Sequence, residues 1–167
     1  MHAFSPSQCA TWLAGRQVVE TPVGTTPGGG QYVRLSSVAS PAVVDALVES
    51  VGHPIDVLLQ FTDLSVFGNT APPASLSWLN KVAPATGDWP QHARRGLLFA
   101  EGEEQALHDC CKYVLAEGAS AFLYAPNVAL TIGLWESEFI ELWGPEVTAI
   151  NAVVKRLALH SVRVCKQ

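Results

Sequence analysis

Charged residues are scarce in this sequence. Lys, Arg, Asp and Glu together make up 15% of its 167 residues, against about 25% in a typical soluble domain. A chain with so little charge leaves much neutral surface, which favours a homo-oligomer or a face covered by a partner. The net charge of −5 argues against nucleic-acid binding, because affinity for phosphates requires clustered Lys and Arg.

Long apolar runs are also missing. No stretch approaches the ~18 residues of a membrane-spanning helix, and the opening residues 1–6 lack both the basic and the apolar region of a secretory signal. The four cysteines show no CxxC spacing, and the adjacent Cys110 and Cys111 cannot bond to each other without distorting the backbone. Reduced thiols are typical of the cytosol. We therefore expect a cytoplasmic protein with no membrane-embedded part.

The apolar residues that are present follow clear periods. Helical spacing predicts helices that begin at Ser5 and Ser40, one over 103–117, and one after Pro145. Gly15 and Gly52 are expected to end the first two, Gly15 in a left-handed conformation. Strands are predicted over 16–20, 31–35, 55–61, 97–100, 121–124, 128–135 and 139–143, the last two as antiparallel neighbours. Helices that alternate with strand pairs predict an α+β fold: a mixed, mostly antiparallel sheet with about four helices packed on it.

The length predicts one domain over residues 1–167, large enough to bury a core. Within it, the Pro-rich segment 68–96 is predicted to be an irregular connection that contains one short helix at 76–82. Three consecutive glycines at 28–30 precede a strand, and no lysine accompanies them. They therefore predict a flexible hairpin loop rather than a phosphate cradle.

No catalytic or metal-binding motif stands out. His108, Cys110 and Cys111 look like ligands in the sequence, but a zinc site needs three or four convergent ligands. Both cysteines coincide with the apolar period of the 103–117 helix, so we expect them to pack in the core with Leu107 and Leu115, and we expect no metal or cofactor. A cysteine nucleophile paired with a distant histidine stays an alternative, because catalytic partners are often far apart in sequence.

The loop 88–95 combines aromatic, imidazole and guanidinium groups, a combination common in binding sites. Trp89, His92, Arg94 and Arg95 are therefore an alternative set of binding residues. The competing interpretation is a surface loop whose tryptophan packs into the core.

Charge is segregated along the second half of the chain. Between Glu101 and Glu146 there are nine acidic residues and one basic residue, Lys112, a local net charge of −8. After position 146 the sign reverses, and the C-terminal helix carries Lys155 and Arg156. An acidic field of this density attracts basic partners and speeds their association. The alternative is that the cations of the C-terminal helix neutralise the acids within the same fold.

The segment 135–143 interleaves acids with large aromatic residues. Alternation along its strand places Phe139, Glu141 and Trp143 on one face. Aromatic anchors beside carboxylates suit recognition of a basic protein. The candidate partner-binding residues are Trp135, Glu136, Glu138, Phe139, Glu141 and Trp143.

These patterns favour a non-enzymatic protein-interaction module, such as a small acidic inhibitor or a bacterial immunity-type protein that masks a basic toxin. The small size, the acidity and the lack of a catalytic motif are the basis of this expectation. Two alternatives stay open. One is a small-molecule binder or an enzyme that uses the 88–95 loop and His108, and the other is a self-associating structural subunit.

Overall fold

The computed structural model describes residues 1–16, 18, 31–36, 40–52, 56–63, 95–116, 119–135 and 138–165. Most of the predicted strand 16–20, the glycine loop, the helix predicted at 76–82 and the binding loop from Trp89 to Arg94 lie outside these residues. Of the Pro-rich segment 68–96, Arg95 and Gly96 are described, and Gly96 already begins a strand.

The described strands form one sheet, in the order β1-β4-β3-β5-β6-β7-β2-β8, and every pairing among them is antiparallel. This confirms the α+β class and the antiparallel character of the sheet. The strands are β1 (His2–Phe4), β2 (Gln31–Ser36), β3 (Val57–Asp63), β4 (Gly96–Phe99), β5 (Ser120–Ala125), β6 (Leu130–Trp135), β7 (Phe139–Gly144) and β8 (Arg163–Val164).

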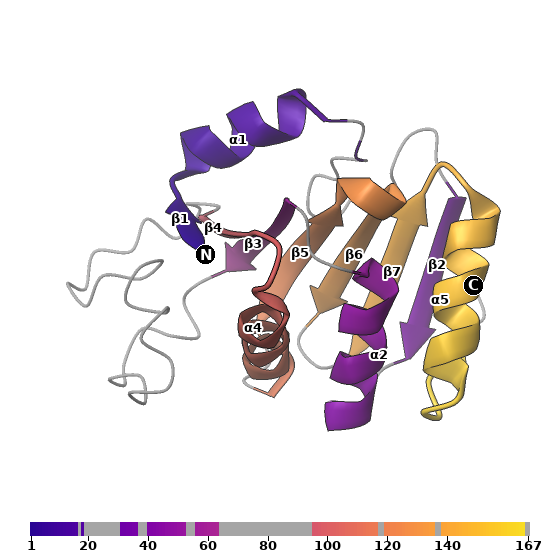
Figure 1. The fold of residues 1–167 in the computed structure, drawn as a ribbon. Helices are drawn as coiled ribbons and strands as arrows, with labels where there is room; N and C mark the ends of the chain where they lie inside the picture. The colour runs from indigo at the N-terminus through magenta and orange to yellow at the C-terminus, as the bar shows by residue number, and fades with distance from the viewer. Residues whose placement is uncertain are drawn as a thin grey trace.

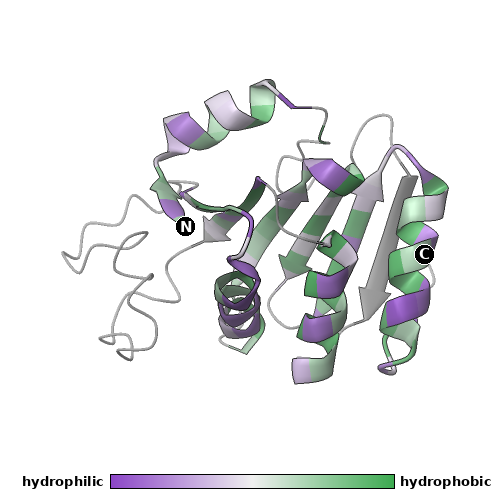
Figure 2. Ribbon diagram, viewed as in Figure 1, coloured by the Kyte–Doolittle hydropathy of each residue, from purple (hydrophilic) through white to green (hydrophobic). Residues whose placement is uncertain are grey.

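The helices lie on both faces of the sheet. α2 (Pro41–Val51), α4 (Glu104–Ala116) and α5 (Val147–Ala158) stand side by side over one face, and their apolar residues share a core with alternate residues of β3 to β7 (Figure 1). α1 (Pro6–Ala14) packs on the other face, where Cys9, Trp12 and Leu13 join Leu58 and Phe122 in a second cluster. Figure 2 shows that the central strands are largely hydrophobic. In α2 and α5, hydrophobic and hydrophilic residues alternate around the helix axis.

The first two helices begin as their sequences predict. Ser5 and Gln8 form a reciprocal capping box, and the side chain of Ser40 accepts a hydrogen bond from the backbone of Val43. Gly52 ends α2 at φ 72°, a conformation that glycine adopts without strain. The prediction for Gly15 is wrong in one respect: its φ is −85°, because α1 ends in a tight turn in which the N–H of Arg16 donates to the carbonyl of Leu13.

The two later helices bury the predicted faces with some differences. In α4, Leu107, Cys110, Cys111 and Leu115 are fully buried, as expected. In α5 the apolar period predicts a buried stripe that includes Val147 and Ala158, but the buried residues are Ile150, Val153 and Leu157, while Val147 and Ala158 are exposed. None of the described helices is long and apolar enough to span a bilayer.

Two strand starts were predicted too early. Pro126–Val128 forms a 3-10 turn, Ala129 follows in a left-handed conformation at φ 50°, and β6 begins only at Leu130. Asp56, at φ 64°, makes the corresponding turn before β3. Each turn changes the direction of the chain, and the strand begins after it.

Candidate functional site

The candidate residues of segment 135–143 lie on the consecutive antiparallel strands β6 and β7. Trp135 stands opposite Phe139, and Gly133 stands opposite Glu141. Phe139, Glu141 and Trp143 share one face of β7, while Ile140 and Leu142 join the core on the face covered by α2, α4 and α5. The predicted alternation along this strand is therefore confirmed.

The exposure of these residues divides them into two groups. Glu141 and Trp143 are 5% and 2% exposed, so neither is a surface anchor. Trp135 and Phe139 are partly buried, and Glu138 is exposed in the turn, where its N–H bonds to the carbonyl of Trp135. We call Trp135, Glu138 and Phe139 the hairpin anchor. Glu136 lies outside the described residues.

The buried side chain of Glu141 orients Trp135 of the hairpin anchor. The indole N–H of Trp135 donates to Oε2 of Glu141 at 2.7 Å. Gly133 makes this arrangement possible, because a Cβ there would lie 2.7 Å from Nε1 of Trp135 and 2.9 Å from the ring of Trp143. The buried carboxylate thus fixes the orientation of a partly exposed indole rather than facing a partner itself.

Aromatic packing adds to this support. The ring of Phe122 on β5 meets the indole of Trp135 edge to face, with centroids 5.4 Å apart, and lies 5.8 Å from the ring of Trp143. Trp135 and Phe139 lie 6.2 Å apart across the hairpin. Such edge-to-face and tilted pairs restrict ring motion, so the outer rings are held in place before any partner arrives.

Arg156, one of the two cations in the alternative of internal neutralisation, contacts another helix. Arg156 on α5 approaches Glu49 at 3.9 Å and donates to the hydroxyl of Ser50 at 3.4 Å, and both of these residues belong to α2. α2 and α5 cover the face of the sheet opposite to Glu141. The described contacts of Arg156 therefore do not support internal neutralisation of the hairpin acids.

Of the alternative candidates, Arg95 and His108 belong to the part of the chain that the structure describes. Arg95 directly precedes β4, and its carbonyl accepts a hydrogen bond from the N–H of Phe61. His108 links two helices: its Nε2 lies 2.8 Å from a carboxylate oxygen of Asp45 on α2, and its Nδ1 lies 3.3 Å from Asp109. Across the described part of the chain, no group of three or more His, Cys, Asp or Glu side chains could hold a metal ion.

The cysteines are free, and three of them are buried. Burial raises the pKa of Cys9 to about 11 and that of Cys111 to about 12. The pKa of Cys110 is also raised, first by burial and then by the nearby Cys111 and Asp109. Thiols of this kind stay protonated at neutral pH, and the thiolate is the reactive and metal-binding form. The packing role predicted for Cys110 and Cys111 is confirmed.

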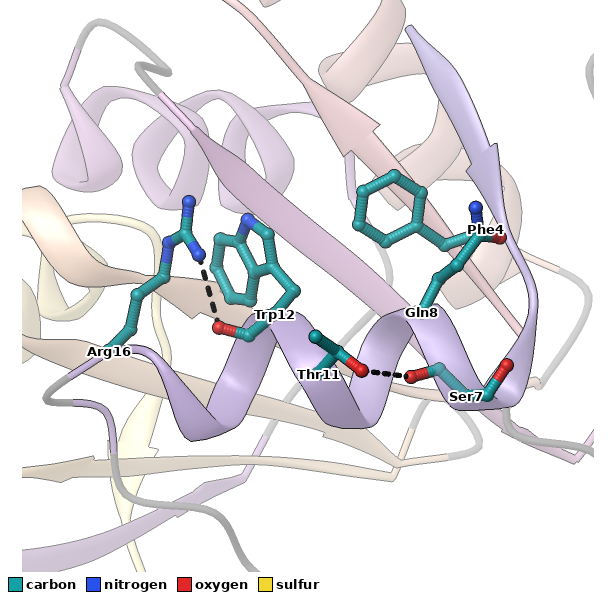
Figure 3. A pocket seen from close by; sticks show the side chains of 6 residues that line it. All are labelled: Phe4, Ser7, Gln8, Thr11, Trp12 and Arg16. Carbon is teal, nitrogen blue, oxygen red and sulfur yellow. Dashed lines mark hydrogen bonds between the residues drawn. The ribbon is translucent and has the colours of Figure 1, made fainter.

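The structure also gathers residues to which the sequence patterns assigned no function. Phe4, Gln8, Trp12 and Arg16 line one groove beside α1 (Figure 3). The four-residue spacing of Gln8 and Trp12 within α1 was the available signal for a shared flank, and Arg16 follows just after the end of the helix.

Relatives offer no guide to either site. Comparisons with protein-family models, with curated proteins and with solved structures find no match for this chain.

Proposed function

We propose that this chain is a non-enzymatic cytoplasmic protein that binds a basic protein through the hairpin anchor, as a small acidic inhibitor of the immunity type would. The observation that carries the proposal is a pair of partly exposed aromatic rings, Trp135 and Phe139, at a hairpin turn that also contains the exposed Glu138. A basic partner would present the Lys or Arg side chains that this chemistry accepts.

The anchor combines two attractions for a cation. The face of an indole or phenyl ring attracts an ammonium or guanidinium group, by about 0.5–2 kcal/mol according to its exposure. A neighbouring carboxylate adds a charge-assisted hydrogen bond. Because Glu141 and Phe122 already orient Trp135, binding costs little ordering of this side chain.

Charge outside the anchor supports the same partner. Glu101 and Glu146 are exposed, and both belong to the acidic segment 101–146. An acidic surface accelerates the encounter with a basic protein, and this acceleration weakens as salt is added. The anchor would then set the lifetime of the complex, because buried aromatic residues dominate most protein interfaces.

The test begins with a basic protein that co-purifies in stoichiometric amount from the native host, followed by binding kinetics on purified components. We expect Glu138→Lys to slow association several-fold, as raised salt also would. Trp135→Ala should speed dissociation by about tenfold or more. Asp109→Lys, the same charge reversal on α4, is the matched control and should change association much less.

Two results would contradict the proposal. One is an unchanged dissociation rate for Trp135→Ala in a variant that remains folded. The other is an equal loss of association rate in Glu138→Lys and Asp109→Lys, which would assign the effect to net charge alone.

A further inference from the structure

A groove runs along one flank of α1, well away in strand order from the β6–β7 hairpin. It has a volume of about 420 Å³ and is lined by Phe4, Ser7, Gln8, Thr11, Trp12 and Arg16. This volume lies within the range of about 300–1,000 Å³ that is typical of small-ligand sites. Figure 3 shows the rings of Phe4 and Trp12 projecting to the same side of α1.

Most polar groups of the groove already have partners within the fold. Oε1 of Gln8 already accepts the N–H of Ser5 at 2.8 Å, and the Thr11 hydroxyl donates to the carbonyl of Ser7 at 2.9 Å. The Trp12 side chain is different: the residue is 6% exposed, and its indole N–H finds no acceptor among the described residues. A buried donor without an acceptor is rare in native proteins and indicates a missing partner.

Arg16 supplies positive charge at one end of the groove. Its guanidinium lies 4.1 Å from the centre of the Trp12 ring, and Nη1 donates to the carbonyl of Trp12 at 3.1 Å. The remaining amine, Nη2, pairs with Asp56, whose side chain is 44% exposed. The carboxylate of Asp56 already pairs with one side of the guanidinium group. The carboxylate of a ligand could therefore compete with Asp56 for the same position on Arg16.

We propose that this groove binds a small aromatic carboxylate. The aromatic ring lies between Phe4 and Trp12, where offset or edge-to-face packing is favourable. The carboxylate accepts from Arg16 and from the indole N–H of Trp12, and it displaces Asp56 towards solvent. A neutral aromatic molecule gains the ring contacts but not the charge-assisted hydrogen bonds, so the site prefers the acid. This site does not depend on the hairpin anchor.

Phenylacetate is the probe, and phenylacetamide is its neutral counterpart. A ligand of this size is expected to bind with a Kd of about 1–10 mM. In ¹H–¹⁵N spectra, the indole signal that Trp12→Phe removes should move downfield on addition of phenylacetate, because its N–H gains an acceptor. Arg16→Gln should weaken binding by about tenfold, the loss expected for one charge-assisted hydrogen bond.

Asp56→Asn supplies a test in the opposite direction. It removes the competing carboxylate and should tighten phenylacetate binding several-fold, and Asn tolerates the left-handed backbone at this position (φ 64°). Arg156→Gln, on the opposite face of the sheet, is the control and should leave binding unchanged.

The proposal is overturned if the Trp12 indole signal does not respond to phenylacetate, or if phenylacetamide binds as tightly as the acid. An Arg16→Gln variant with a native spectrum and unchanged affinity would overturn it as well. If Trp12→Phe does not fold, the Arg16 and Asp56 variants still decide the question through the affinities alone.

Discussion

Gly133→Ala should be among the most damaging single-methyl additions in this sheet. The added Cβ would meet Nε1 of Trp135 at 2.7 Å and two ring carbons of Trp143 at 2.9 Å. These atoms belong to indoles that pack against Phe122, so they cannot swing away as a flexible side-chain end would. Overpacking of this kind costs about 1–3 kcal/mol, and the Trp135–Glu141 hydrogen bond is strained at the same time.

An opposing effect is smaller. Replacing Gly by Ala reduces the entropy of the unfolded chain and stabilises by about 0.4–1 kcal/mol where the native backbone accepts Ala. The net destabilisation is therefore expected at roughly 1–2 kcal/mol. For a chain of this length, that lowers Tm by about 2–8 °C. Urea denaturation followed by circular dichroism measures the change directly.

Gly15→Ala is the matched control. A Cβ at Gly15 would lie 3.8 Å or more from its neighbours, and φ there is −85°. This variant should be neutral or slightly stabilising, within about 0.5–1 kcal/mol. The double variant Gly133→Ala with Trp135→Phe should recover part of the loss, because Phe removes the nearest clashing atom. Equal denaturation midpoints for Gly133→Ala and Gly15→Ala would refute the reasoning.

Three further outcomes are expected. Leu107→Ala and Leu115→Ala, at fully buried positions of α4, should each lower the free energy of unfolding by about 2–5 kcal/mol; unchanged urea midpoints would contradict the burial. Burial raises the pKa of Cys111 from 9.0 to about 12, so above pH 9 the unfolded thiol loses its proton first and stability falls as pH rises, by about 1.4 kcal/mol per pH unit. Cys111→Ala should flatten this alkaline decline between pH 9 and 12, and an identical decline in both proteins would count against it. Leu159 follows α5 and is 81% exposed. Leu159→Ser should weaken any self-association, as measured by sedimentation equilibrium at several concentrations; equal association constants would exclude this residue from the contact.

Much of the fold could be predicted from the sequence, because it depends on interactions between residues that are close together along the chain. The Ser5 and Ser40 caps, the four-residue period of α4 and the alternation along β7 each depend on neighbours within a few residues. Boundaries were less accurate at Asp56 and Ala129, which adopt positive φ values without being glycine. Nothing in the side chains alone demands those conformations.

Only part of the candidate site could be predicted from the sequence. Alternation placed Glu141 on the same face as Phe139, but period alone does not distinguish a carboxylate that faces a partner from one that holds an indole. That distinction depends on what lies across the sheet: Gly133 opposite Glu141, and Phe122 on the next strand. The same limit applies to the predicted role of Arg156, whose neighbours on α2 are about a hundred residues away.

By itself, the sequence determined where the described helices and the central strands form, which residues are apolar enough for the core, and where acidic charge is concentrated; the short edge strands β1 and β8 were not predicted. Only the tertiary structure decided that Glu141 is buried beneath Trp135, that Arg156 of α5 contacts α2, and that Phe4, Trp12 and Arg16 line one groove, with Arg16 paired to Asp56. The reason is the range of the interactions involved. Capping and periodicity act over one to four residues along the chain, whereas burial and pairing arise from strand order, which brings together residues that are far apart in sequence.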